Sequence, residues 1–134
     1  MTSKRCGLAI LVVACFAAGC HKGGESSGSS VTEAQLGLPF YTGSQEMPNA
    51  SATMEMPDGK SVRSVRTTKD DPVQVCNFYN DKIVNKQGTH SEASGNKAAG
   101  LTGKLGDGSD VAISALRNGS NDTIVTVTVS SHKK

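Results

Sequence analysis

The run Ile124–Val129 constrains the fold most, because it reads IVTVTV and alternates apolar with hydroxyl side chains. Strict period-two alternation of β-branched residues predicts a strand with one buried face and one solvated face. Its valines would face a core and its threonines would face water. Strands of this kind are typical of an antiparallel sheet that is covered on one side.

Other segments also have strand-like patterns, and turn-forming residues separate several of them. The predicted strands are Ala52–Met56, Ser61–Thr67, Thr89–Ala93, Lys97–Leu105 and Asp110–Leu116. The predicted turns are Pro57–Lys60, Gly106–Ser109 and Asn118–Asn121. In Ser61–Thr67 the alternation is imperfect, with Arg63 and Arg66 among the valines, which predicts an edge strand carrying protective charge.

One helix is expected after Asp71. Asp71 is suited to the N-cap, Pro72 to the first helical position and Gln74 to a capping box. Apolar residues then recur at helical spacing, and the pattern fades near Val84 before Gly88. The predicted helix therefore has roughly thirteen residues.

Together these elements predict an α+β fold, with a single helix packed on one face of a small antiparallel sheet as a two-layer sandwich. The largest hydrophobic side chains available form two pairs, Phe40–Tyr41 and Phe78–Tyr79. We expect at least one residue of each pair to lie in the core.

The N-terminal segment has the three parts of a secretory signal peptide. Lys4 and Arg5 precede Cys6–Gly19, which carries no charge and ends in small residues. A helix of that length would rise about 21 Å, less than the roughly 30 Å of a bilayer's hydrocarbon core. Residues 1–19 are therefore predicted to be a signal peptide, in preference to a membrane-spanning helix.

The sequence Ala17-Ala18-Gly19-Cys20 resembles the lipobox of bacterial lipoproteins, although that family prefers Leu where Ala17 stands. The resemblance implies that Cys20 is lipidated and becomes the first residue of the mature chain. Plain secretion and an uncleaved anchor are the alternatives. His21, rather than Asp, follows Cys20, which by the sorting pattern of Gram-negative lipoproteins implies an outer-membrane protein facing the periplasm.

A linker is expected after Cys20. Seven of the eight residues 23–30 are Gly or Ser, so this stretch has no apolar face to bury. We predict a flexible tether over residues 20–36, a globular domain over 37–131 and a short tail over 132–134.

A second resemblance covers about half of this domain. The segments Leu38–Gly43 and Arg66–Val75, followed by Phe78-Tyr79, look like a pattern in small exported bacterial proteins of unknown function. Thr42 departs from the Pro usual in that pattern. The resemblance implies an exported α+β domain and no particular activity.

Few residues suggest chemistry. Cys76 is the one cysteine outside the signal segment and the lipobox, so no internal disulfide is expected and the thiol is interpreted as a small core residue. His90 has no nearby Cys or His at metal-ligand spacing. Neither a metal nor a cofactor is predicted.

The acidic pairs also have simple structural interpretations. One member of Asp70–Asp71 would cap the helix and the other would be solvated. Asp107 and Asp110 fit a hairpin turn better than a calcium loop. We find no catalytic set, and therefore predict that the protein is not an enzyme.

Net charge gives no reason to expect a nucleic-acid partner. Loss of Lys4 and Arg5 would reduce the 14 basic residues to 12, equal to the 12 acidic residues. The preferred hypothesis is a lipid-anchored envelope protein, a binding or assembly module whose partner adds a strand at Ser61–Thr67. The alternative is a small-ligand carrier or an enzyme that uses a cleft beside the helix.

Overall fold

A computed structural model describes residues 30–133. The predicted signal peptide, Cys20 and most of the predicted tether lie outside these residues. The elements, in chain order, are α1 (Glu33–Leu36), β1 (Gln45–Glu46), β2 (Ala52–Met56), β3 (Gly59–Thr68), α2 (Pro72–Tyr79), the 3₁₀ helix η1 (Asn80–Lys82), β4 (Val84–Ala93), β5 (Asn96–Lys104), β6 (Asp110–Arg117) and β7 (Thr123–His132).

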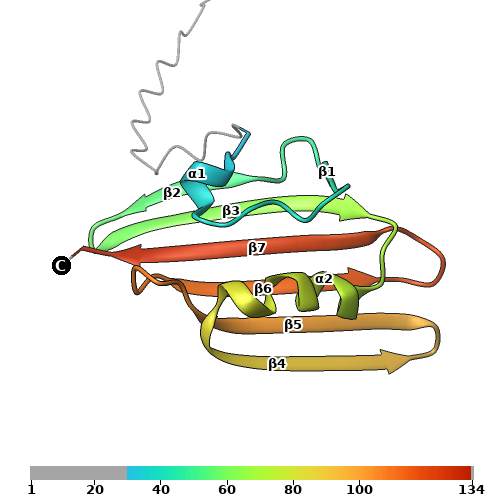
Figure 1. Ribbon diagram of the computed structural model, residues 1–134. Coiled ribbons are helices and arrows are strands. Elements are labelled where there is room, and N and C mark those ends of the chain that lie inside the picture. The colour runs from blue at the N-terminus through green and yellow to red at the C-terminus, as the bar shows by residue number, and fades with distance from the viewer. Residues whose placement is uncertain (1–29, 134) are drawn as a thin grey trace, which may run out of the picture.

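An antiparallel sheet of seven strands dominates the structure (Figure 1). The strand order is β1-β3-β7-β6-β5-β4, and β2 also pairs with β3. Consecutive strands from β4 to β7 are neighbours, whereas β3 pairs with the last strand, β7. The sheet therefore ends at β4 on one side and at β1 and β2 on the other.

The prediction that Ser61–Thr67 is an edge strand was wrong. This segment lies inside β3, which has β7 on one side and β1 and β2 on the other. Val62 pairs with Val129 and faces the core, whereas Val65 pairs with Thr126 and faces the opposite side. Both valines are buried, which shows that β3 is covered on both faces at these positions. This explains why apolar and polar residues do not alternate strictly in this strand.

The core lies on one face of the sheet. The alternation in β7 is confirmed, since Val125, Val127 and Val129 are all buried. They share their face with Val111, Ile113 and Ala115 of β6, which the register places beside them. Helix α2 covers this face and contacts β5, β6 and β7. Its residues Val75 and Tyr79 belong to the same hydrophobic cluster. In Figure 1, α2 lies in front of β6 and β5.

The start of α2 agrees with prediction at Asp71 and Pro72, the predicted capping box through Gln74 does not form, and the end of the helix differs from prediction. Asp71 is the N-cap and accepts a hydrogen bond from the Val73 N–H at 3.0 Å. The α-helix has eight residues, not thirteen, and continues for three more as η1. Ile83 then becomes extended and is buried, so its side chain joins the core from the start of β4 rather than from a helix. Gly88 lies within β4 and does not end the helix.

The packed structure begins earlier than predicted. Val31 and Leu36 are buried, although they belong to the segment interpreted as tether. Between them, Thr32 and Gln35 form a capping box that starts α1, and Gly37 ends it with a φ of 71°. At the other end, His132 belongs to β7 rather than to a tail.

The prediction for the aromatic pairs is confirmed, since Tyr41 and Tyr79 are buried. Phe78 lies between them and makes edge-to-face contacts with Tyr41 at 5.2 Å and with Tyr79 at 4.9 Å. Burial raises the pKa of Tyr79 to about 12. These rings join the segment before β1 to α2.

We expect Tyr79→Ala to destabilise the protein by about 3–5 kcal/mol, because it leaves a cavity under α2. For a domain of this size each kcal/mol lowers Tm by about 4–8 °C. Thermal unfolding followed by circular dichroism measures the change. Val73→Ala is the control, since Val73 lies in the same helix and is 42% exposed. Equal melting temperatures for the two variants would contradict this description of the core.

Candidate functional site

The one sequence-predicted modification site, Cys20, lies outside the described residues. Inside them, the residues that suggested chemistry are Cys76, His90 and the acidic pairs.

Cys76 and His90 both line a shallow hollow of about 260 Å³ beside α2. Its walls are one side of α2 and the neighbouring parts of β4 and β5. The lining residues are Val73, Cys76, Asn77, Asn80, Gly88, Thr89, His90, Ala99, Gly100 and Leu101. This is the position at which a cleft beside the helix was considered from the sequence.

The residues that line this hollow are poorly suited to catalysis or metal binding. Cys76 is half-buried, and burial raises the pKa of its thiol, which reduces the fraction of nucleophilic thiolate. No carboxylate lines the hollow. Within residues 30–133, no group of three or more His, Cys, Asp and Glu side chains could hold a metal ion. The hollow is better suited to receiving a side chain than to activating a nucleophile.

Asp70 is not the solvated carboxylate that the sequence suggested. Its Oδ2 accepts a hydrogen bond from the Tyr41 hydroxyl at 2.7 Å. Burial, together with this hydrogen bond and the nearby negative charge, raises the pKa of Tyr41 to about 12. Asp70 therefore holds the segment before β1 against the start of α2, and it does not line the hollow near Cys76.

Asp71 has a second structural role besides the N-cap. Its Oδ2 accepts a hydrogen bond from Lys97 Nζ at 2.9 Å, which connects α2 to β5. The Lys97 ammonium, and then the hydrogen bond from the Val73 N–H, lower the pKa of Asp71 below its ordinary value.

Two other groups of charged residues are also accounted for by structure. Asp107 accepts from the Ser109 N–H in the β5–β6 turn, as the hairpin interpretation predicts. Asp110 pairs with Lys104 at 2.6 Å, and hydrogen bonds from Lys104 and His132 lower its pKa. Arg66 lies over the Phe40 ring at 4.2 Å, and its side chain does not form an edge patch with Arg63.

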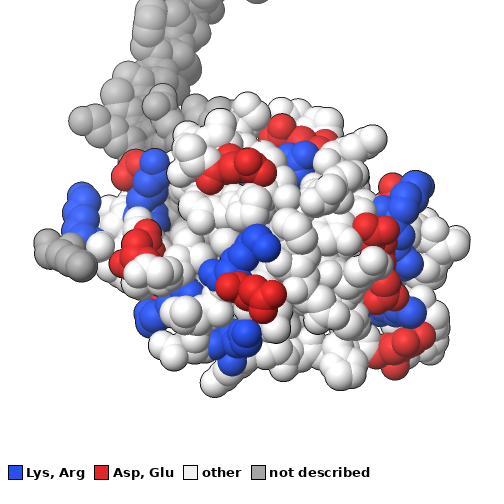
Figure 2. Space-filling model, viewed as in Figure 1, with Lys and Arg blue, Asp and Glu red and all other residues white. Residues whose placement is uncertain are grey.

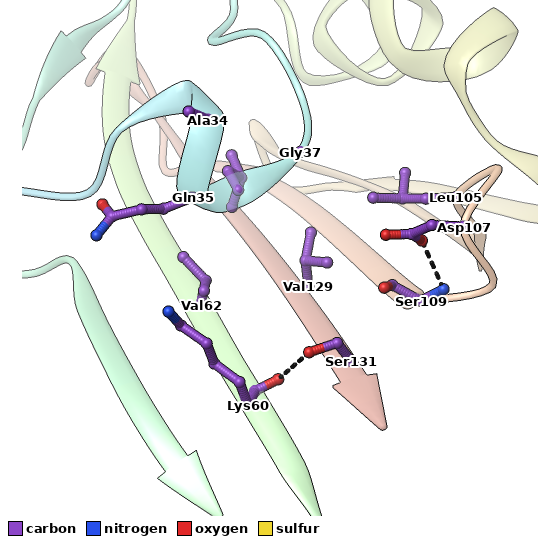
Figure 3. A pocket seen from close by; sticks show the side chains of 11 residues that line it. Ala34, Gln35, Gly37, Lys60, Val62, Leu105, Asp107, Ser109, Val129 and Ser131 are labelled. Carbon is purple, nitrogen blue, oxygen red and sulfur yellow. Dashed lines mark hydrogen bonds between the residues drawn. The ribbon is translucent and has the colours of Figure 1, made fainter. Parts of the chain in front are cut away.

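A larger hollow, of about 440 Å³, was not found from the sequence (Figure 3). It lies between α1, the ends of β3 and β7 and the β5–β6 turn. Leu36, Val62, Leu105 and Val129 give it apolar walls, with Lys60 and Asp107 at its rim. The sequence signal that could have revealed this hollow is the capping box of α1, formed by Thr32 and Gln35. It was missed, so the helix that forms one wall of the hollow was not predicted.

The most open feature is the edge strand β4. All ten of its residues are exposed. β4 pairs with β5 on one side, and no described strand pairs with its other side. Figure 2 shows that positive and negative side chains are interspersed over the α2 side of the molecule, with no large area of one sign. A partner at β4 would therefore be recognised by backbone hydrogen bonds and individual charges.

Comparisons with protein-family models, with curated proteins and with solved structures returned no match. In residues 30–133, no helix has both the length and the apolar character needed to cross a membrane.

We expect Asp71→Ala to lower the free energy of unfolding by about 1 kcal/mol at neutral pH, as removal of an N-cap does. Because the folded-state pKa of Asp71 is lowered, its charge stabilises the fold above the unfolded pKa. That contribution is lost as pH falls through the folded pKa. Urea unfolding should therefore show a smaller difference from wild type near pH 2 than near pH 7.

Asp81→Ala is the matched control for Asp71→Ala, since Asp81 is exposed in η1 and its side chain caps no α-helix. A destabilisation of Asp71→Ala that is the same at both pH values would contradict the role of the carboxylate charge.

The raised pKa of Cys76 predicts slow alkylation of the native thiol. At pH near 7, iodoacetamide should modify the Cys76 peptide several-fold more slowly in the folded protein than in the urea-unfolded chain. Mass spectrometry of the digested protein measures the rate. Faster modification in the folded state would favour a reactive thiol.

Proposed function

We propose that this chain is a lipid-anchored protein of the bacterial cell envelope whose folded domain is a non-enzymatic binding or assembly module. The proposed lipid anchor is supported by the order of residues 4–20, which are two basic residues, an uncharged apolar run that ends in three small residues, and Cys20. Two or three acyl chains hold a protein at a membrane where a single chain does not.

The domain boundary supports the tether in this proposal. Val31 is the first buried residue described, so about ten residues separate Cys20 from the packed structure. As a Gly/Ser-rich linker they would have a reach of roughly 17 Å. The domain would then stand close to the headgroups, with freedom to orient its surfaces.

The surfaces of the domain support a binding role rather than catalysis. We propose the finer architecture as a two-layer sandwich in which α2 is the principal helix on one face and β4 stays accessible at the edge. The partner would use β4, since Ser61–Thr67 is interior to the sheet. Both hollows are shallow, and the thiol in one of them has a raised pKa.

In a Gram-negative cell, we propose the outer membrane, facing the periplasm, because His21 rather than Asp follows Cys20. The resemblance to small exported proteins agrees with this location. The balanced charge of the mature chain agrees with a partner other than nucleic acid.

A second function is favoured by one observation, the hollow of about 260 Å³ beside α2. It could hold a small ligand, which would make the domain a carrier or an enzyme. An enzyme would use His90 as the base for Cys76, but burial raises the pKa of that thiol, and Asp70 is hydrogen-bonded to Tyr41. Binding of a chain segment at β4 uses the same hollow without requiring catalysis.

Cys20→Ala should abolish lipidation and move the protein from the membrane fraction to the soluble fraction of the cell envelope. Fractionation after a salt wash, with intact mass measurement of the purified chain, gives the result. Cys76→Ala is the control and should stay membrane-bound with its acyl mass. A Cys20→Ala variant that remains in the washed membranes would overturn the proposed anchor.

A further inference from the structure

Strand β4 presents a free row of backbone donors and acceptors at the end of the sheet. It pairs with β5 along one side only, and Figure 1 shows no described segment beyond it. Every residue of β4 is exposed, including those on the α2 side, because α2 contacts β5, β6 and β7. An open edge of this kind pairs readily with another strand.

We propose that β4 pairs antiparallel with β4 of a second copy of this chain, around a two-fold axis at Thr89. The inference rests on the proposed function and deepens it, because it names the partner of the assembly module. A two-fold contact uses the same surface on both copies, so the strand must be complementary to itself when reversed.

The charges of β4 meet this requirement. In a register centred on Thr89, Lys86 lies opposite Glu92 of the second copy, and Glu92 lies opposite Lys86 of that copy. Both side chains are exposed; Glu92 lies in the regular part of the strand, and Lys86 lies in the bulge directly before its first regular residue, Gln87. In the isolated chain, Lys86 Nζ donates to the Asn80 carbonyl at 2.9 Å and Glu92 lies 3.8 Å from Lys97. These contacts are at the surface and can coexist with pairs across the axis.

The uncharged positions fit the same register. Thr89 meets Thr89, a favourable cross-strand pair, and Gln87 meets Ser91. His90 lies opposite Gly88 of the second copy, where no side chain stands. A Cβ at Gly88 would have only ordinary contacts, 3.8 Å to the Gly100 carbonyl and 3.9 Å to Leu101 Cδ1. The imidazole therefore has room above the hollow that Gly88 helps to line.

Other registers lack these features. Moving the axis to His90 would place the two imidazoles opposite each other and leave Glu92 opposite Gly88. Lys86 would then face Ser94, which lies beyond the strand in the β4–β5 turn with a φ of 53°. The charge pattern therefore selects the axis at Thr89.

The bulge in β4 sets the length of the contact. Pairing with β5 is irregular between Val84 and Gln87, and Asn85 has a φ of 51°. With the axis at Thr89, regular residues of both copies therefore pair over Gln87–Ser91, about 17 Å of strand, and Lys86 and Glu92 flank this stretch. A contact between two edge strands of this length buries less surface than a standard interface, which buries about 800 Å² per partner. We expect weak association in solution and much higher occupancy on a membrane, where anchoring raises the effective concentration.

Disulfide trapping in cells tests the register, using the full chain in a Cys76→Ser background. With the axis at Thr89, the two copies of a cysteine introduced by Thr89→Cys would have Cα atoms about 5 Å apart, within the range of a disulfide. Cysteines introduced by Ser91→Cys, on the same face of the same strand, would be about 13 Å apart and could not join. After mild oxidation, Thr89→Cys should give about tenfold more covalent dimer than Ser91→Cys.

A charge exchange tests the pairing chemistry in the Thr89→Cys chain. Either Lys86→Glu or Glu92→Lys alone places like charges opposite each other and should reduce the trapped dimer several-fold. The double variant restores opposite charges and should restore the dimer. Both positions are exposed, and circular dichroism checks that each variant remains folded.

The result that overturns the second-copy partner is equal trapping at positions 89 and 91, no trapped dimer at 89, or no recovery in the double variant. Trapping of a different envelope protein at position 89 would also overturn it, while leaving the assembly role intact. All samples are taken from the washed membrane fraction, so a failure of anchoring is seen separately, as loss of the chain from that fraction.

Discussion

The burial of one face of β6 and β7 under α2 is the contact on which the other parts of the structure depend. Val75 and Tyr79 are almost fully buried against the valine face of β7 and its neighbours in β6. Fully burying such side chains contributes roughly 1.5–3 kcal/mol each, a large part of the stability of a small domain. Because Cys76 is the only cysteine in the described chain and is free, the fold has no covalent cross-link there to replace this packing.

The segment before β1 is held to this core by polar contacts of several kinds. Tyr41 reaches Asp70 just before α2, and Arg66 of β3 lies over the Phe40 ring and donates to Ser44 Oγ at 2.8 Å. Glu33 of α1 accepts from the Phe40 N–H. These contacts hold the first part of the domain over β3. The opposite end of the sheet has no such cover in the described residues, since β4 and the outer part of β5 extend beyond α2.

The elements that could be predicted from the sequence are those with a local physical signal. The alternation in β7, the hairpin turns and the Asp71 cap each depend on residues close together in the chain, and the structure has them all. The position of Ser61–Thr67 depends on β1, a strand of two residues, and on β7, which lies about sixty residues later. No local pattern reports such pairing, so a strand buried on two faces was mistaken for an edge.

The same distinction applies to the candidate sites. Cys76 and His90 line one hollow because α2 and β4 pack against the same part of β5, which their spacing in the sequence does not reveal. The hollow near α1 depends on burial of Leu36, which was assigned to the tether because the Gly/Ser-rich residues 23–30 precede it. The proposed lipidation motif is the reverse case, because it is proposed from adjacent residues alone and does not depend on the fold.

The charges on β4 bear on why an open edge of this length can be tolerated in a small domain. A bulge and isolated charges are the usual means by which edge strands avoid unspecific pairing. In β4 the bulge removes Asn85 and Lys86 from regular pairing with β5, and the two charged residues of the strand, Lys86 and Glu92, have opposite sign at opposite ends. An edge protected against pairing with its own copies would carry charges of one sign, because like charges repel in any antiparallel pair of copies. In β4 the two opposite charges lie at equal distances from Thr89, so only the register centred on Thr89 places Lys86 opposite Glu92 of the second copy. In the proposed dimer the same two residues therefore specify the register and disfavour other pairings of the edge.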